Sequence, residues 1–167
     1  VAEESGIILL ERNFTGPMEY YIPYYGNFSP DSMMLNNASR SGNIITAEND
    51  FTKQGQWNQV WGGPFINLAP GNYRAVFRIM TDNSSSSNSI ILLVSHHINS
   101  TAVTISSMTL NGSSLKTNTW ENVSIYFHVG VLESSVEFRG DSPEWGGTLF
   151  FGGVTVQQVS PAPVIYT

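Results

Sequence analysis

Apolar and polar residues alternate with a period of two over much of this chain. The alternation is clearest in segment 72–81, where a helix would instead need apolar residues three and four positions apart. The segment is therefore predicted to form a half-buried β-strand. One face of this strand would carry Tyr73, Ala75, Phe77 and Ile79, and the other face Arg74, Val76, Arg78 and Met80.

Similar short runs recur along the chain, separated by turn sequences such as Ala-Pro-Gly-Asn at 69–72 and Asn-Gly at 111–112. No window of ten or more residues carries a helical apolar stripe with capping residues. About eight to ten short strands at this spacing predict an all-β sandwich or barrel built from antiparallel sheets. The expected strands lie at 6–14, 43–48, 59–68, 72–81, 89–97, 102–110, 120–129, 135–139 and 148–159.

Alternation within the later strands also predicts which side chains form the core. Segment 90–94 is apolar on both faces, as a covered central strand would be. Glu137 and Arg139 are expected to point outward. The expected inward side chains are Val123, Ile125, Phe127, Val129, Val136, Phe138, Phe150, Val154 and Val156, together with Trp61 and Trp120.

The composition changes within the first 42 residues, where Pro17, Pro23 and Pro30 interrupt any regular pattern. Proline lacks the N–H that a central strand needs. We therefore expect residues 1–42 to contain an N-terminal strand and an irregular Tyr- and Pro-rich segment, packed on or leading into a sandwich formed by residues 43–159. Residues 160–167 would be a tail or linker. Neither a signal peptide nor an anchor is visible, and we expect the chain to be a segment of a longer protein.

Charge and composition exclude several classes of partner. Charged residues make up 12% of the chain and the formal net charge is −6, whereas nucleic-acid binding needs clustered Lys and Arg. No apolar run approaches the roughly 20 residues that span a bilayer, and there is no polybasic segment for a membrane surface. The chain has no cysteine, which excludes disulfides and thiolate metal sites.

Acceptor triplets for N-glycosylation are frequent. An Asn- and Ser-rich surface creates such triplets by accident, but an exported glycoprotein would also carry them. Sparse charge leaves few ion pairs to lose in acid, so we expect an extracellular or cell-surface domain that works at acidic pH. The seven triplets begin at Asn13, Asn27, Asn37, Asn83, Asn99, Asn111 and Asn122.

Four features follow one another along the chain: GPFINLAPGNYRAVF at 63–77, a strand that begins with Trp120, VEFRG at 136–140 and GTLFFGGVTV at 147–156. This order resembles the jelly-roll sandwiches of the galactose-binding-like superfamily. That superfamily includes many carbohydrate-binding modules and sandwich domains appended to cell-surface glycosyltransferases. The resemblance covers roughly residues 43–158 and implies a jelly-roll fold and carbohydrate binding. Calcium-binding members often carry an Asp near the closing strand, where this chain has Gly152 and Gly153, so no calcium site is predicted.

Carbohydrate sites stack aromatic rings on the apolar faces of sugars and hold the hydroxyls with polar side chains. Trp57 and Trp145 lie in polar loops, where exposure would make them stacking platforms. The alternative for each is a ring that packs into the rim of the core. The polar contacts to the ligand are predicted to come from Arg139, Asp141 and Glu144.

The predicted function is a non-catalytic carbohydrate-binding-module-like domain of a larger surface or membrane protein. The alternative is a structural or protein-interaction module, such as the extracytoplasmic appendage of a membrane glycosyltransferase or a surface-layer component. Its partner would be a neighbouring domain of the parent protein. The interaction surface would be formed by Tyr20, Tyr21, Tyr24 and Tyr25.

The ionisable residues do not predict a reaction. A glycosidase needs two opposed carboxyl groups, one of them buried, whereas three of the four acidic residues in this part of the chain lie at turns or outward positions, where they would be solvated. His96 and His97 are adjacent, so on a strand they would face opposite sides and could not share a metal ion. We therefore expect no enzyme activity, no metal site and no cofactor. The four acidic residues are Glu133, Glu137, Asp141 and Glu144.

Overall fold

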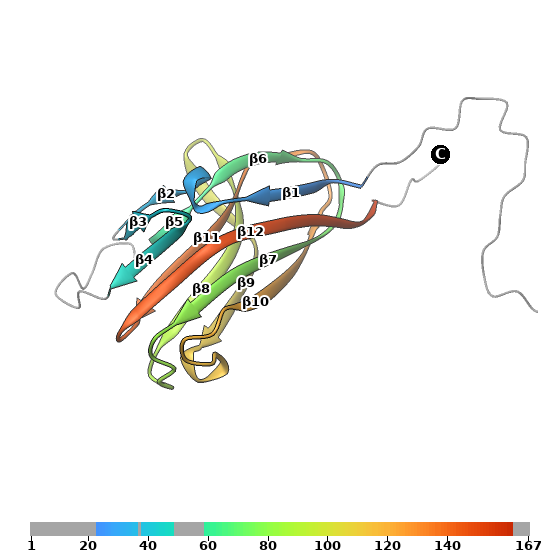
Figure 1. Ribbon diagram of the computed structural model, residues 1–167. Coiled ribbons are helices and arrows are strands. Elements are labelled where there is room, and N and C mark those ends of the chain that lie inside the picture. The colour runs from blue at the N-terminus through green and yellow to red at the C-terminus, as the bar shows by residue number, and fades with distance from the viewer. Residues whose placement is uncertain (1–22, 37, 49–58, 162–167) are drawn as a thin grey trace, which may run out of the picture.

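The computed structural model of the chain is a β-sandwich of two antiparallel sheets (Figure 1). It describes residues 23–36, 38–48 and 59–161. The first sheet has the strand order β10-β7-β12-β4-β3, and β1 pairs with β12 beside this path. Its strands are β1 (Tyr25–Phe28), β3 (Ser39–Ser41), β4 (Ile44–Glu48), β7 (Gly71–Thr81), β10 (Glu121–Val129) and β12 (Thr148–Pro161).

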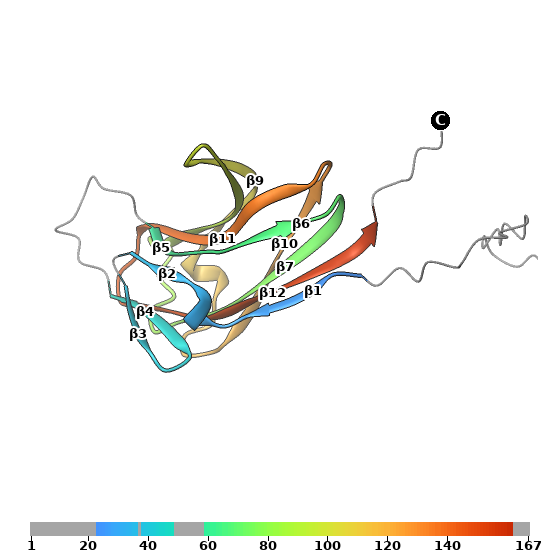
Figure 2. The same ribbon diagram turned by 90° about the horizontal axis from the view of Figure 1, so that it is seen from above.

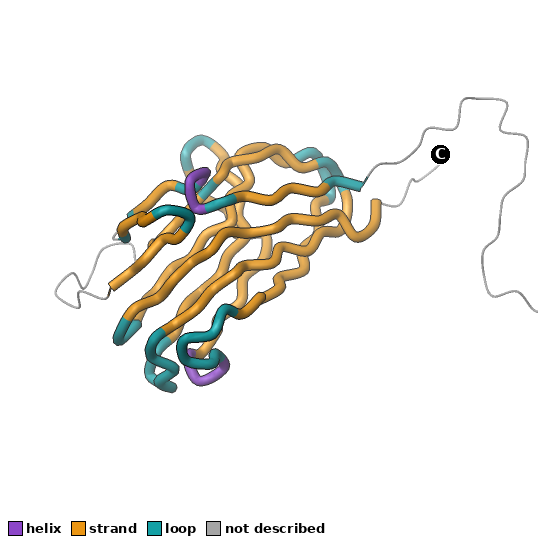
Figure 3. The backbone as a smooth tube through the Cα atoms, viewed as in Figure 1, coloured by secondary structure: helices purple, strands orange, loops and turns teal. Residues whose placement is uncertain are grey.

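The second sheet has the order β2-β5-β11-β8-β9, and β6 pairs with β11. Figure 2 shows the two sheets as separate layers. The described residues add only two short helical turns, η1 (Pro30–Ser32) and η3 (Gly112–Ser114), which stand out in Figure 3. None of the described helices could cross a membrane. The strands of the second sheet are β2 (Met34–Leu35), β5 (Gln59–Gly62), β6 (Pro64–Leu68), β8 (Ser89–Ile98), β9 (Thr101–Asn111) and β11 (Glu133–Glu144).

The apolar core lies between the sheets and is formed by alternate residues of the long strands. Trp61 on β5 stacks on Phe151 on β12 with ring centroids 4.1 Å apart, so the two layers are joined by an aromatic pair. The predictions of an inward Trp61 and of an inward Val136 and Phe138 are confirmed, because all three are fully buried. Burial of this apolar area is the main favourable term in folding.

The all-β jelly-roll prediction is confirmed, with differences in individual strands. The single strand expected at 59–68 is divided into β5 and β6 at Gly63, which has a φ of +110°. Pro64 is the first residue of β6, a position where a strand tolerates proline. The part of the first 42 residues expected to be irregular contributes the short strands β1, β2 and β3. The strand expected at 6–14 lies outside the described residues, as does the segment 162–167.

Candidate functional site

Strand β7 places two arginines on the outer face of the first sheet. Its alternate residues Tyr73 and Phe77 are buried in the core, so the residues between them must point away from the second sheet. Arg74, Val76 and Arg78 therefore lie on the outside of the sandwich, as the sequence pattern predicts.

The register of the sheet places Arg74 in a row of four outward side chains. Arg74 pairs with Tyr126 on β10 and with Gln157 on β12, and Gln157 pairs with Tyr25 on β1. Tyr25 is 66% exposed and Tyr126 is 64% exposed. A guanidinium and an amide thus lie between two accessible phenol rings.

Neutral polar side chains continue this surface along the strands. Val76 pairs with Thr155 on β12, and Thr155 pairs with Asn27 on β1. Arg78 pairs with Asn122 on β10. Amide and hydroxyl groups of this kind both donate and accept hydrogen bonds, so the face can match the hydroxyl groups of a polar ligand.

The face is hollowed over β12, with a cavity volume of about 430 Å³. The register between β12 and β7 shifts between Phe151 and Val154, and the residues within this bulge are Gly152 and Gly153. Two glycines leave space because no side chain rises from the sheet there. Among the described residues that line the hollow, none is acidic; the lining includes Tyr25, Asn27, Arg74, Arg78, Asn122 and Gln157.

Trp120 lies at the edge of this face and fixes Arg78. The Arg78 guanidinium carbon is 4.5 Å from the Trp120 ring centroid, a geometry of cation–π attraction. A Cβ atom added to Gly152 would lie 3.1 Å from Trp120 and 3.3 Å from the Cδ atom of Arg78. The expectation that Trp120 belongs to the core is therefore wrong: its half-buried ring packs over Gly152, where β12 offers no side chain.

Arg74, which lines the hollow, has an unsatisfied donor. Its Nε atom is buried and has no hydrogen-bond partner among the described residues. A buried donor without an acceptor costs about 1–3 kcal/mol.

Of the two predicted stacking platforms, the structure describes only Trp145. Trp145 is 2% exposed and belongs to the core, so its predicted role as an exposed platform is wrong. The side chain of Asn88 holds the loop against the core, because it accepts a hydrogen bond from Gly146 N at 2.7 Å and donates to Gly146 O at 3.0 Å. Trp57 lies outside the described residues.

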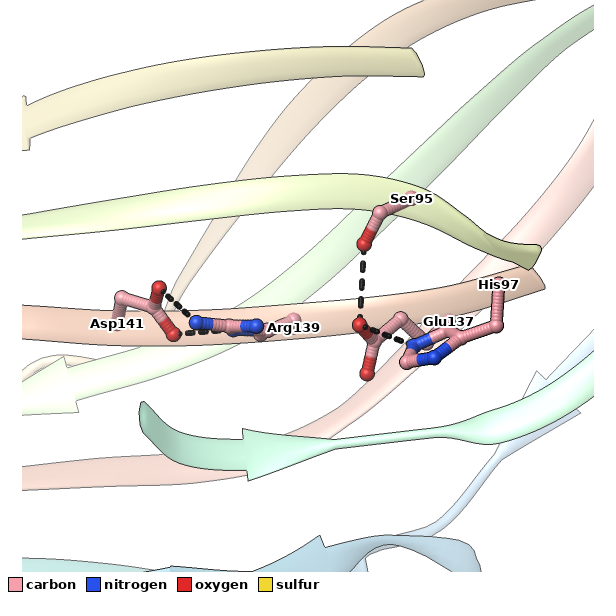
Figure 4. Close-up of polar contacts among 5 residues, drawn as sticks. All are labelled: Ser95, His97, Glu137, Arg139 and Asp141. Carbon is pink, nitrogen blue, oxygen red and sulfur yellow. Dashed lines mark hydrogen bonds and ion pairs between the residues drawn. The ribbon is translucent and has the colours of Figure 1, made fainter. Parts of the chain in front are cut away.

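Arg139 and Asp141, two of the predicted ligand contacts, lie on the outer face of the second sheet and bind each other (Figure 4). Arg139 donates to both carboxylate oxygens of Asp141 at 2.6 Å, and this hydrogen-bonded pairing raises the pKa of Arg139. Glu144 ends β11. Among the described residues, no exposed tryptophan lies beside this pair. The pair is on the second sheet, whereas the hollow is on the first.

Glu137 points outward on β11 but is only 2% exposed, so the expectation of a solvated side chain is wrong. Ser95 Oγ donates to its Oε1 atom at 3.1 Å, and His97 Nε2 lies 2.9 Å from the same oxygen (Figure 4). His96 contacts Glu133 instead. In the described part of the chain, no group of three or more His, Cys, Asp or Glu side chains could hold a metal ion.

The predicted tyrosine interaction surface is described only in part. Tyr24 packs its ring edge against Tyr73, with centroids 6.3 Å apart, and burial raises its pKa. Tyr25, the next residue, is directed to the outer face. Tyr20 and Tyr21 lie outside the described residues.

Comparison with solved structures places this architecture among carbohydrate-binding modules. The C-terminal CBM6 of LamC, a marine laminarinase from Zobellia galactanivorans, superposes with a TM-score of 0.54 at 15% identity, over 81% of this chain and 100% of the other. The xylan-binding module CBM15 gives 0.53 at 11% identity, over 84% and 97%. The CBM6 module of Cellvibrio mixtus lichenase 5A, solved with cellotriose, gives 0.52 at 9% identity, over 80% and 97%.

No protein-family model matches the chain. No curated protein matches it by sequence either. The fold therefore defines the class, a jelly-roll sandwich like those of carbohydrate-binding modules. At these identities the likeness concerns the fold, and a function has to be argued from the site.

Proposed function

We propose that this domain is a non-catalytic carbohydrate-binding module and that the outer face of the first sheet is its sugar site. The observation that carries the proposal is the row Tyr25, Gln157, Arg74 and Tyr126, which combines exposed rings with amide and guanidinium donors beside a hollow. Rings provide apolar contact to pyranose faces, and the polar groups orient the hydroxyls. The fold likeness to carbohydrate-binding modules supports the same function.

The chemistry of the hollow supports a binding role without catalysis. Glycoside hydrolysis needs a general acid and a second carboxylate on either side of the bond. Among the described lining residues there is no Asp or Glu. The buried Glu137 lies on the other sheet and is held by Ser95 and His97.

A glycan array and equilibrium binding with Tyr25→Ala/Tyr126→Ala test this function. The wild-type domain should bind at least one polysaccharide, and the double variant should bind it about tenfold or more weakly, because exposed aromatic anchors carry a large share of binding energy. Leu132→Ala is the matched control, since Leu132 is an exposed apolar residue outside the hollow. Equal affinity of wild type and double variant would refute the site.

A protein-interaction role is the competing function. Tyr25 supports it, because this exposed ring belongs to the tyrosine surface predicted for a neighbouring domain. A blank glycan array, together with binding of a neighbouring domain of the parent protein that Tyr25→Ala abolishes, would favour that role over sugar binding.

We also infer that the domain is extracellular or at a cell surface and carries N-linked glycans. The five acceptor asparagines within the described residues are all exposed: Asn27, Asn83, Asn99, Asn111 and Asn122. Asn27 and Asn122 line the hollow, so modification there would compete with a ligand. Peptide mass spectrometry of the native protein would identify the occupied positions.

A further inference from the structure

The charge at the hollow is opposite to the charge of the whole molecule. The chain has a formal net charge of −6 and only seven Lys and Arg residues. Arg74 and Arg78 nevertheless both line the hollow, and the described lining contains no carboxylate. The local field therefore favours a negatively charged ligand over a neutral one.

These two arginines differ from other arginines of the described chain. The Nε atom of Arg40 lies 3.7 Å from the Oδ1 atom of Asp31, and Arg139 donates two hydrogen bonds to Asp141. The described residues provide no such carboxylate for Arg74 or Arg78 within 4.0 Å. Each planar guanidinium group can form bidentate hydrogen bonds with two oxygens of a carboxylate or sulfate group.

The two guanidinium groups are held apart on one strand. Arg74 and Arg78 are four residues apart, which corresponds to about 13 Å between their Cα atoms on an extended strand. Trp120 fixes Arg78, while Arg74 lies between Tyr126 and Gln157. Two positive groups at this spacing fit successive charges along a polymer better than one small anion.

We infer that the ligand is an acidic polysaccharide, whose uronate carboxylates or sulfate esters are bound by Arg74 and Arg78. This inference rests on the proposed sugar-binding function. The guanidinium group of Arg74, which lines the hollow, binds one acidic group. Arg78, stacked on Trp120, binds another, while Tyr25 and Tyr126 contact the sugar rings.

Paired polymers that differ only in their acidic groups test the inference. Isothermal titration calorimetry compares polygalacturonate with its carboxyl-reduced form, and dextran sulfate with dextran, which also separates carboxylate from sulfate recognition. An acidic polymer should bind at least about tenfold more tightly than its neutral counterpart, and Arg74→Gln/Arg78→Gln should remove that difference. Lys116→Gln, which removes one positive charge from an exposed residue outside the hollow, should retain it.

The possible outcomes separate the inference from the function on which it rests. If a neutral polymer binds as tightly as its acidic counterpart, and Tyr25→Ala/Tyr126→Ala weakens it, the sugar site stands and the acidic specificity is refuted. If none of the four polymers binds and the glycan array is blank, both are refuted. Arg78 is exposed, so the single Arg78→Gln variant will test the inference even if changing the half-buried Arg74 disturbs folding; unchanged affinity for the acidic polymer would contradict it.

Discussion

At the scale of single residues, Glu137 is a structural carboxylate on the face opposite the proposed site. Its Oε1 atom accepts hydrogen bonds from Ser95 and His97, and its Oε2 atom would lie 2.8 Å from a Cβ added to Gly62 on the adjacent strand β5. Strand alternation predicts that Glu137 points outward. It does not predict that side chains of the neighbouring strands bury it.

Glu137→Ala is expected to lower the free energy of unfolding by about 1–3 kcal/mol, because it leaves the Ser95 hydroxyl and the His97 ring without their acceptor. Urea denaturation measures this change. Glu48→Ala, which removes an exposed carboxylate on β4, is the control and should leave the midpoint almost unchanged. A Glu137 variant as stable as wild type would show that the cluster contributes nothing to folding.

The exposure of Trp120 and Trp145 is predicted wrongly from the sequence, which shows why exposure is harder to predict than the strand pattern. Trp145 is in a loop, yet Asn88, 58 residues away from Gly146, fastens that loop to the core. Trp120 precedes an apolar strand, yet it packs outside the sheet over Gly152. Both outcomes depend on partners that are distant in sequence, so local composition carries no signal for them.

At the scale of elements, the long strands could be predicted and the short edge strands could not. The period of two in β7 and β10 identifies both faces correctly and places Arg74 and Arg78 on the outer face, although the predicted ligand contacts do not include them. Strands β1 to β3 have two to four residues each and lie at sheet edges or beside β12. Such segments are too short for a periodic signal, and β1 is fixed by its pairing with β12 rather than by its own composition.

The bulge of β12 yields a prediction with two separable effects. Gly153 has a φ of +112°, and an added Cβ would lie 2.6 Å from Phe28 O. Gly153→Ala should therefore reduce stability by about 1–3 kcal/mol. Gly152→Ala should mainly displace Trp120 and Arg78, and so weaken polysaccharide binding with a smaller loss of stability.

Urea denaturation and binding calorimetry on the same variants measure the two effects. Gly130→Ala is the matched control, because its added Cβ would meet only His128 Nε2, at 3.7 Å. The interpretation of the bulge would be wrong if Gly152→Ala and Gly130→Ala bound equally well, or if Gly153→Ala matched Gly130→Ala in stability.

At the scale of the whole molecule, the two outer faces carry different sets of side chains. The first sheet carries the proposed ligand face, and the second carries the Glu137 cluster and the Arg139–Asp141 pair. Packed sheets lie about 10 Å apart, and substitutions at that distance without shared partners usually add to within about 0.5 kcal/mol.

A double-mutant cycle between Tyr25→Ala and Glu137→Ala is therefore expected to give a coupling energy below about 0.5 kcal/mol in both binding and unfolding. Binding calorimetry and urea denaturation of the two single variants and the double variant supply the values. A larger coupling would mean that the core transmits changes from one face to the other.

The pairing of β1 with β12 also determines how this sandwich could be inserted into another protein. The described chain enters through Tyr25, which lies opposite Gln157 near the exit of β12. Entry and exit are thus neighbours, an arrangement that tolerates insertion of one domain within another. A host protein could display the whole sandwich from a single surface turn, with little separation between the two points of attachment.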